Sequence, residues 1–513
     1  MEQPGEREDL FARGAHTKGL RRSAHAGWTP ILILAGASTT IGSSLTVGFN
    51  IGVVNAPAEV IKSFCNISVQ ERYGVTLQDG AMDVLWSAIV SIFIVGGVIG
   101  SLGGSYLADK LGRKGGIVMS TVLATASSVC FLSCKVANSV ELLVLGRLLV
   151  GLSSGLATCI VPMYLMELAP LRLRGPLGVL CPLGVTFGVL VGQIMSLNTV
   201  LGTEDAWPQL LGFYLVFVLI SSLAIPFLPE SPKYLYVVKK DTTLALKQLE
   251  NIRNLPSECL TPDILELQAE QASEKRNWSL GQVISEKTLL LPILLVCSMQ
   301  AGQQFVGINA VFYYSVSIFM RAGLNESNSQ LATIGAGIIN LAMAVISIPV
   351  MSRFNRRSVF QLSCGTAAVF LALLGVAITY IETISWMPYV SIIGVLGFVL
   401  TYGIGLGPIP YFIGSELFEV GPRPSAMALG SMANWGGNFI IGMTFPTMQR
   451  VIGAASFFIF SAIAILLFVF IRLYLPETRG RDPTFIAQVC RNGLSRPRPP
   501  MSPIGSFSSS DTA

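Results

Sequence analysis

The stretch Glu167-Leu-Ala-Pro-Leu-Arg-Leu-Arg174 follows an apolar run, and its acid and base recur seven positions apart as Glu416 and Arg423. Two further motifs repeat: Gly112-Arg113-Lys114 as Asn355-Arg356-Arg357, and Pro229-Glu230-Ser231-Pro232 as Pro476-Glu477-Thr478. The three repeats are offset by 249, 243 and 247 residues. An offset this constant across unrelated motifs predicts two parallel, pseudo-symmetric halves.

The composition places this repeat in a membrane. Of the 513 residues 52% are hydrophobic and 12% charged, against about 25% charged in soluble proteins, and the mean hydropathy is +0.63. This excludes soluble, disordered and secreted disulfide-rich classes. The net charge of +5 gives no nucleic-acid signal, the two histidines lie in the N-terminal tail, and the nine cysteines lack metal-ligand spacing. We therefore predict no metal and no cofactor.

Apolar runs of about 20 residues, the length of a membrane helix, predict an all-α integral membrane protein with twelve spans, six in each half. The predicted spans are 30–54, 83–107, 115–134, 142–167, 176–199, 209–228, 288–319, 329–351, 358–380, 387–414, 425–446 and 453–475. The domains would be an N-terminal tail (1–27), a first bundle (28–228), a linker (229–286), a second bundle (287–476) and a C-terminal tail (477–513). Helical spacing at 244–250 and 264–270 predicts a helical linker, and the Ser- and Pro-rich end of the tail predicts disorder.

The loops set the orientation. With a cytoplasmic N-terminus, the short inner loops hold nine Lys and Arg residues and the outer loops five, which predicts that both termini are cytoplasmic. No retention signal is present in the tail, which favours the plasma membrane. The repeated charges then lie on the cytoplasmic side, where they could bridge the halves when that side closes and separate when it opens. The residues of this predicted latch are Glu167, Arg174, Arg113, Glu416, Arg423, Arg356 and Arg357. The alternative interpretation is a set of topology signals at solvated loop ends.

Over residues 28 to 485 the chain resembles the facilitative hexose transporters, the sugar porters of the major facilitator superfamily. The resemblance rests on the joint order and spacing of several motifs. These include Gly48-Phe-Asn-Ile-Gly-Val-Val-Asn-Ala-Pro57, Leu107-Ala-Asp-Lys-Leu-Gly-Arg-Lys114, Val161-Pro-Met-Tyr-Leu-Met-Glu167, Gln303-Gln-Phe-Val-Gly-Ile-Asn309, Gly421-Pro-Arg-Pro424 and Pro476-Glu-Thr-Arg-Gly480. It implies the major facilitator fold and a small neutral sugar as the substrate.

The resemblance implies a substrate site at mid-membrane between the halves. Its implied contacts are Gln303, Gln304, Asn309, Asn340, Asn434, Trp435, Asn438 and, where the family has a tryptophan, Tyr411. Carboxamides suit sugar hydroxyls because they donate and accept hydrogen bonds without charge, and they are costly in a membrane unless they face a cavity or a partner. Hydrogen bonding between helices is the alternative. The adjacent Gln303 and Gln304 cannot point the same way, so at least one would contact a neighbouring helix.

Two gates are implied as well. Tyr313 and Tyr314 resemble the family's outer gate, although an interfacial aromatic belt is the alternative interpretation. Glycines and prolines interrupt span 387–414 and predict a bend there, which the family uses as an inner gate. These residues are Gly403, Gly405, Gly407, Pro408 and Pro410.

Three positions depart from the family's glucose carriers. Pro182 stands where a glutamine is usual, Gly403 where a glutamate is common, and Tyr411 where a tryptophan closes the hinge motif. Because a lost hydrogen-bond partner in a buried site can change selectivity, fructose is at least as plausible a substrate as glucose.

Asn50 occupies the place of an aspartate in proton-coupled relatives, so we predict facilitated diffusion by a uniporter. The spans contain no histidine for a nucleophile–base pair, so we predict no enzyme activity. The main alternative is a urate or polyol transporter, because the family includes such substrates, and another is a non-transporting sugar receptor; Arg147 lies within a span but does not discriminate between them. Asn66, in the long first outer loop, is the favoured N-glycosylation site over Asn325 and the cytoplasmic Asn277. The bilayer and the sugar are the expected partners, and the sequence indicates no oligomeric state.

Overall fold

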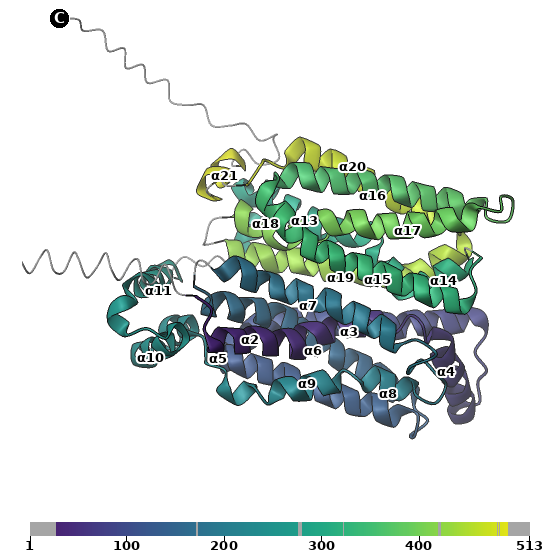
Figure 1. Cartoon of the computed structure of the whole chain (residues 1–513), viewed down its shortest axis with the longest axis horizontal. Coiled ribbons are helices and arrows are strands. Elements are labelled where there is room, and N and C mark those ends of the chain that lie inside the picture. Colours follow the sequence, from purple (N-terminus) through teal and green to yellow (C-terminus); the bar gives the residue numbers. More distant parts are fainter. Residues whose placement is uncertain are drawn as a thin grey trace, which may run out of the picture.

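A computed structural model describes residues 27–170, 173–274, 280–321, 323–418, 422–479, 481 and 483–490. The regular elements in this part are all helices, and they lie along one axis in two layers (Figure 1). The first-half helices form the lower layer of that view and the second-half helices the upper layer. The linker helices lie at one end of the bundle and α4 lies at the opposite end. We call these the linker end and the α4 end.

The described part of the first half and the linker holds eleven α-helices, and the π-helical turn η1 joins the first two. They are α2 (Pro30–Thr39), η1 (Thr40–Ser44), α3 (Leu45–Gly52), α4 (Ala58–Tyr73), α5 (Asp79–Cys134), α6 (Val140–Leu168), α7 (Arg174–Met195), α8 (Trp207–Gly212), α9 (Leu215–Ser222), α10 (Thr242–Arg253), α11 (Thr261–Glu274) and α12 (Leu280–Ser285). Helices α10 and α11 cover the stretches 244–250 and 264–270 that have helical spacing in the sequence.

The second half repeats the pattern. Its helices are α13 (Leu290–Phe305), α14 (Ile308–Arg321), α15 (Glu326–Arg353), α16 (Arg356–Thr379), α17 (Met387–Ile404), α18 (Ile409–Leu417), α19 (Arg423–Val451) and α20 (Ala455–Tyr474), followed by the short α21 (Pro483–Cys490). Helix α21 lies in the predicted C-terminal tail. Residues 491–513, for which disorder is predicted, lie outside the described part of the structure. Most of the N-terminal tail lies outside it too.

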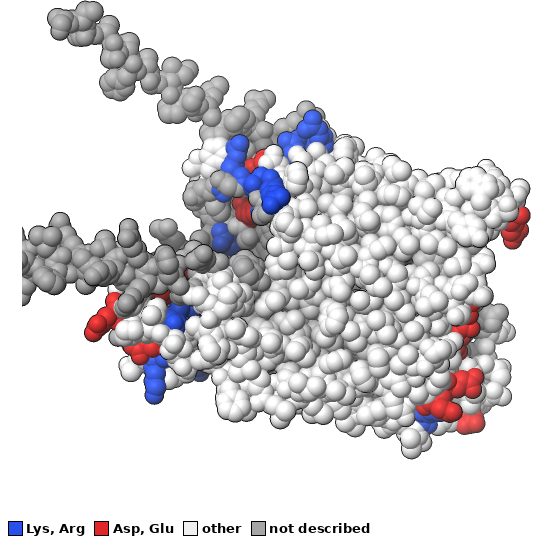
Figure 2. Space-filling view, in the orientation of Figure 1, with Lys and Arg blue, Asp and Glu red and all other residues white. Residues whose placement is uncertain are grey.

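The surface confirms an integral membrane protein. Eleven helical segments of the described chain are long and apolar enough to cross a bilayer. The one remaining predicted span, 425–446, is α19, a helix of 29 residues whose hydropathy is lowered by Asn434 and Asn438. Figure 2 shows charged side chains gathered at the two ends and a broad uncharged belt between them.

The second and third predicted spans are joined in one long helix, α5, whose backbone leaves the helical conformation at Gly112. Gly112 has a φ of +86°, and a Cβ there would lie 2.3 Å from Oε2 of Glu230. A side chain would therefore be strained by the backbone and would also displace this carboxylate.

The predicted span 288–319 corresponds to one apolar span, Lys287–Phe312, whose helix breaks between α13 and α14. Gly307 at the break has a φ of +93°, and a Cβ there would lie 2.6 Å from the ring of Phe460. The predicted bend in span 387–414 is confirmed, since α17 ends at Ile404 and α18 begins at Ile409.

Helix α4 was not predicted. Its apolar residues are too few for a span, but Ile61 and Cys65 are buried against the rest of the first half. Gly74, in the left-handed conformation, ends the helix.

Candidate functional site

Five carboxamides from three helices form one hydrogen-bonded network in the second half. Gln300, Gln303 and Gln304 lie on α13 at a spacing that brings side chains to neighbouring positions on a helix. Nδ2 of Asn434 donates to Oε1 of Gln303 at 2.7 Å and to Oε1 of Gln300 at 2.9 Å. Nε2 of Gln304 donates to Oδ1 of Asn434 at 3.1 Å, and Nδ2 of Asn309 donates to Oε1 of Gln304 at 2.5 Å. Four of the predicted contacts are thereby brought together.

The network also holds the break between α17 and α18. Nε2 of Gln303 donates to the carbonyls of Gly407 at 2.7 Å and Leu406 at 3.1 Å, and Nε2 of Gln300 donates to that of Pro410 at 3.0 Å. The carbonyls of Leu406 and Gly407 lie in the break between the two helices, and Gln303 bonds to them, whereas that of Pro410 lies in the first turn of α18. The prediction that Gln303 or Gln304 contacts a neighbouring helix is confirmed. The role of Gln300 was missed, although its position three residues before Gln303 was a usable signal.

The remaining predicted contacts lie around this network. Trp435 on α19 packs against the first half, where Phe93 lies at a ring-centroid distance of 6.4 Å and a Cβ on Gly97 would touch the indole. Asn438 is buried and its Oδ1 has no hydrogen-bond partner among the described residues. Asn340 is half-buried on α15.

Tyr411 on α18 is 55% exposed although it belongs to a membrane span. Gly403 has no room for a longer side chain, because a Cβ there would lie 2.5 Å from Cβ of Met343. The side chains of the predicted outer-gate residues Tyr313 and Tyr314 lie outside the described part of the structure.

The repeated charges at the linker end form a compact cluster in the first half. Nε and Nη2 of Arg113 each donate to a different oxygen of Glu167 at 2.9 Å, and both side chains are only 7% exposed. Oε1 of Glu230 accepts from the backbone nitrogens of Arg113 and Lys114 at 2.9 and 3.2 Å. Ser231 donates to Glu167 at 2.5 Å.

The second half builds the same cluster. Arg356 donates to Oε1 of Glu416 at 3.3 and 3.4 Å, and Thr478 donates to Oε2 of Glu416 at 2.5 Å. The carboxylate of Glu477 accepts from the backbone nitrogens of Arg356 and Arg357 at 2.9 and 3.2 Å. Arg113 thus corresponds to Arg356.

The two arginines of the Glu-x6-Arg motifs have other partners. Arg174 pairs with Glu266 on linker helix α11, and Arg423 donates to the carbonyl of Phe418 at 2.9 Å. These bonds of the predicted latch residues stay within one half or join a half to the linker. Bridging between the halves at this end remains a prediction.

Polar contacts join the halves at the α4 end. Nδ2 of Asn55 donates to Oγ of Ser315 at 2.5 Å, and Oγ1 of Thr333 lies 3.0 Å from the same Oγ. The others are an Asn198–Glu326 hydrogen bond of 2.8 Å and an Asp83–Arg450 ion pair.

Arg147 is buried in the first half and binds two backbone carbonyls there. The carbonyl of Asn50 accepts from Nη1 of Arg147 at 3.1 Å, and that of Ile89 accepts from Nε at 3.3 Å. The guanidinium lies 4.7 Å from the ring centre of Phe93. Arg147 is therefore engaged inside this half.

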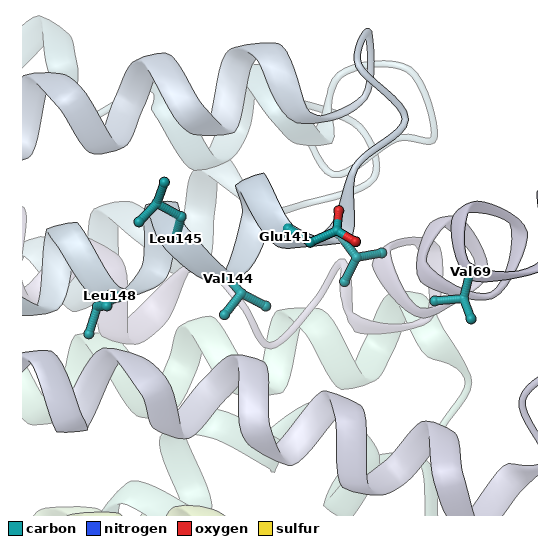
Figure 3. A pocket seen from close by; sticks show the side chains of 6 residues that line it. Val69, Glu141, Val144, Leu145 and Leu148 are labelled. Carbon is teal, nitrogen blue, oxygen red and sulfur yellow. The ribbon is translucent and has the colours of Figure 1, made fainter. Parts of the chain in front are cut away.

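A cavity of about 360 Å³ lies between α4 and α6, lined by Val69, Val140, Glu141, Val144, Leu145 and Leu148 (Figure 3). Five of these residues are apolar, and Glu141 already accepts hydrogen bonds from Ser139 at 2.5 Å, Arg72 at 3.1 Å and Tyr73. This lining offers too few polar groups for a sugar. A second cavity, of about 640 Å³, lies on the linker beside α10.

The predicted glycosylation site lies on α4. Asn66 is half-buried and its Oδ1 accepts from the backbone nitrogen of Leu77 at 3.3 Å. Ser68 of the same tripeptide is buried and donates to the carbonyl of Asn138 at 2.9 Å. Modification of Asn66 stays a prediction, and Asn277 lies outside the described residues.

Comparisons with known proteins also indicate a sugar transporter. Residues 36–489 match the model of a family described as sugar (and other) transporter. The chain is 40% identical over 455 residues to the facilitated glucose transporter member 3 of Canis lupus familiaris, covering 88% of this chain and 91% of the relative. It is 38% identical over 467 residues to member 1 of Gallus gallus, covering 91% and 94%.

Solved structures support the fold. A partially occluded, inward-open structure of the xylose transporter from E. coli superposes with a TM-score of 0.73 at 23% identity, covering 88% of this chain and 100% of that one. A second, inward-open structure of that transporter gives 0.72 at 23% identity, covering 89% and 99%. The twelve-helix, two-half architecture is that of this transporter fold.

Proposed function

This chain belongs to the sugar transporter family, and we propose that it is a facilitative hexose uniporter that works by alternating access between its two halves. It is a membrane transporter of the facilitated glucose transporter type and not an enzyme. The observation that carries the proposal is the carboxamide network around Asn434, which lies against the break between α17 and α18.

The network suits a neutral polyhydroxyl ligand. Nδ2 of Asn434 faces three acceptors, the two Oε1 atoms of Gln300 and Gln303 and the carbonyl of Gln300, but it has only two protons. An acceptor left over in this way is available to a ligand hydroxyl. Gln303 also donates to the carbonyls of the break. Sugar binding to the network would therefore change the hydrogen bonds that hold the proposed inner gate.

Uniport follows from where the carboxylates lie. Each Asp and Glu of the eleven apolar spans, such as Asp83, Glu167 and Glu416, falls within the first or last four residues of its span. Asn50 cannot titrate, and its backbone and side chain are bonded to Arg147 and to the carbonyl of Thr46. No mid-span carboxylate is therefore available to carry a proton. The engagement of Arg147 likewise disfavours urate, since this cation is not offered to a ligand.

Alternating access is supported by the different polar contacts at the two ends. We assign the linker end to the cytoplasm because the Lys and Arg residues of the short loops gather there, so both termini would be cytoplasmic. The contacts at the α4 end would then keep the outer side closed in this structure. The latch residues would bridge the halves only in the opposite state. We also propose the plasma membrane as the location.

The choice between fructose and glucose would depend on the three positions that depart from the family's glucose carriers. Tyr411 is 55% exposed and offers a hydroxyl, Pro182 offers no side-chain hydrogen bond, and Met343 fills the space beside Gly403. This altered donor set is the reason to test fructose beside glucose.

Uptake by purified protein in proteoliposomes tests the function. Radiolabelled glucose, fructose, galactose, urate and inositol would be compared with and without a protonophore. Saturable uptake of a hexose, unchanged by the protonophore, is the expected result. Saturable uptake of urate or inositol alone, or of no compound in the panel, would overturn it.

A matched pair of variants tests the site. Asn434→Leu removes the central donor of the network, and we expect hexose uptake to fall at least tenfold. Gln449→Leu is the control, because Gln449 is also a buried carboxamide of α19 but bonds to Ser456 at 3.1 Å. Equal losses in the two variants would argue against the network as the binding site.

A further inference from the structure

Gln193 on α7 is a buried carboxamide without partners. Its side chain is 3% exposed, and neither Nε2 nor Oε1 has a hydrogen-bond partner among the described residues. Burying an amide without its hydrogen bonds is unfavourable, so such a group in a native protein requires a reason. The carboxamides of the network described above are, by contrast, bonded to one another.

The carboxamide of Gln193 lies at the contact between the two halves. A Cβ built on Gly337 of α15 would lie 2.1 Å from Oε1 of Gln193 and 3.1 Å from Cδ1 of Leu190. Gly337 thus leaves the space that the amide fills. Since α7 belongs to the first half and α15 to the second, separation of these helices would uncover the amide.

The surrounding residues on α15 indicate what the uncovered amide would face. Thr333, four residues before Gly337, belongs to the contact that joins Asn55 to Ser315 at the α4 end. Asn340, three residues after Gly337, is one of the predicted sugar contacts. Residues three and four apart share a helix face, so Gln193 lies between the outer contact and the proposed sugar site.

We propose that Gln193 is a first-half sugar-binding residue of the outward-open state, and that it is left unpaired whenever the outer side is closed. This inference rests on the proposed function. When α7 and α15 separate at the α4 end, the carboxamide can bond to a sugar hydroxyl arriving from outside. When they close, the amide loses that partner, and the cost favours reopening.

Sidedness is the property that separates this role from simple packing. Maltose contains the hydroxyl pattern of a hexose but is larger, and it serves as the probe. Its inhibition constant for hexose transport would be measured from the outer side in right-side-out vesicles and from the inner side in inside-out vesicles. Maltose inhibition of the unmodified protein from the outside is the premise. Its absence, or the absence of hexose transport, would count against the proposed function and not against Gln193 alone.

For Gln193→Leu we expect the outer inhibition constant to rise about five- to tenfold, while the inner constant stays within twofold or falls. A fall at the inner side follows because leucine removes the unpaired amide from the closed outer contact. Leu190→Ala is the matched control, since it weakens the same α7–α15 contact without removing an amide, and its outer constant should stay within twofold.

The proposal would be overturned by an unchanged outer constant in Gln193→Leu, by equal rises on both sides, or by an equal outer rise in Leu190→Ala. Gln193→Asn is the second variant if leucine prevents folding. It keeps the amide but shortens the side chain, and a smaller outer rise is expected. An outer constant in Gln193→Asn identical to that of the unmodified protein would contradict the proposal.

Discussion

The two ends of the bundle hold their polar groups in opposite ways. At the linker end, Arg113 with Glu167 and Arg356 with Glu416 each close a contact inside one half. At the α4 end, contacts such as Asn55 with Ser315 join one half to the other.

The difference follows from what each contact must do. The contacts at the linker end are repeated in sequence, so each half has its own copy, which would keep the internal shape of a half that moves. The contacts at the α4 end join the two halves, and under the proposed alternating access they belong to the interface that would separate. Buried ion pairs with two hydrogen bonds suit the first task, whereas a neutral hydrogen bond such as Asn55–Ser315 and a partly exposed ion pair such as Asp83–Arg450 suit the second.

The largest expected effect comes from breaking the cluster of the first half. Arg113→Ala leaves Glu167, only 7% exposed, without the guanidinium that binds both its oxygens. A buried charge deprived of its partner costs about 3–5 kcal/mol. We expect a corresponding loss of stability, seen as a lower unfolding temperature of the detergent-purified protein.

Two further arginines calibrate this loss. Arg356→Ala should cost less, since the Arg356 and Glu416 side chains are 16% and 24% exposed and their contact is longer, at 3.3 Å. Arg174→Ala should cost about 0–1 kcal/mol, because its pair with Glu266 is about one-third exposed. Equal losses in the three variants would contradict the ranking by burial.

The sequence predicted much of this end but not its pairing. The repeat placed Arg113, Glu167 and Glu230 on one side of the membrane, and the structure gathers them. The sequence did not indicate which partner Glu167 has within its own half, where it bonds to Arg113, 54 residues away. Partner choice depends on which helices pack together, and spacing along the chain does not contain that information.

The family resemblance implied the candidate site residues Gln303, Gln304, Asn309 and Asn434, and the uncharged amides in apolar runs agreed with it. The backbone of the site was not predicted. The break at Gly307 was missed, because one glycine hardly changes the hydropathy of a span and a positive φ leaves no periodic signal. The Asn55–Ser315 contact was equally inaccessible, since it joins residues 260 apart.

A medium effect is expected when the α4 end loses its neutral contact. Asn55→Ala removes the hydrogen bond to Ser315 at 2.5 Å and one from the backbone nitrogen of Val316 at 3.4 Å. At about 1 kcal/mol net for a hydrogen bond, the ratio of open to closed outer states should rise roughly fivefold. The measurement is the rate at which a membrane-impermeant maleimide labels a cysteine introduced by Leu190→Cys.

Ser139→Ala is the control for Asn55→Ala. Ser139 lies at the same end, but its bonds to Glu141 and to the backbone nitrogen of Leu142 stay within the first half. Labelling should therefore change little. A rise equal to that of Asn55→Ala would mean that any loss of polar contacts at this end loosens it.

The smallest effect is expected at the ion pair between Asp83 and Arg450, because their side chains are 32% and 47% exposed. A pair this accessible contributes about 0–1 kcal/mol and is screened by salt. Asp83→Asn should raise labelling of the same cysteine about twofold at low ionic strength, the change expected for about 0.5 kcal/mol, and have almost no effect in roughly 1 M salt. The effect of Asn55→Ala, whose contact is uncharged, should persist at both ionic strengths.

Reversing both charges, Asp83→Arg with Arg450→Asp, separates the cross-half pair from its surroundings. Asp83 also lies 3.9 Å from Lys62 within the first half, so Lys62→Gln is needed beside it. If the pair restrains opening, the double reversal restores slow labelling and Lys62→Gln leaves it unchanged. A salt-independent effect of Asp83→Asn would instead assign this end to packing alone. The ion pair at the α4 end would then have no part in opening. The contrast with the buried arginines of the linker end would no longer be electrostatic.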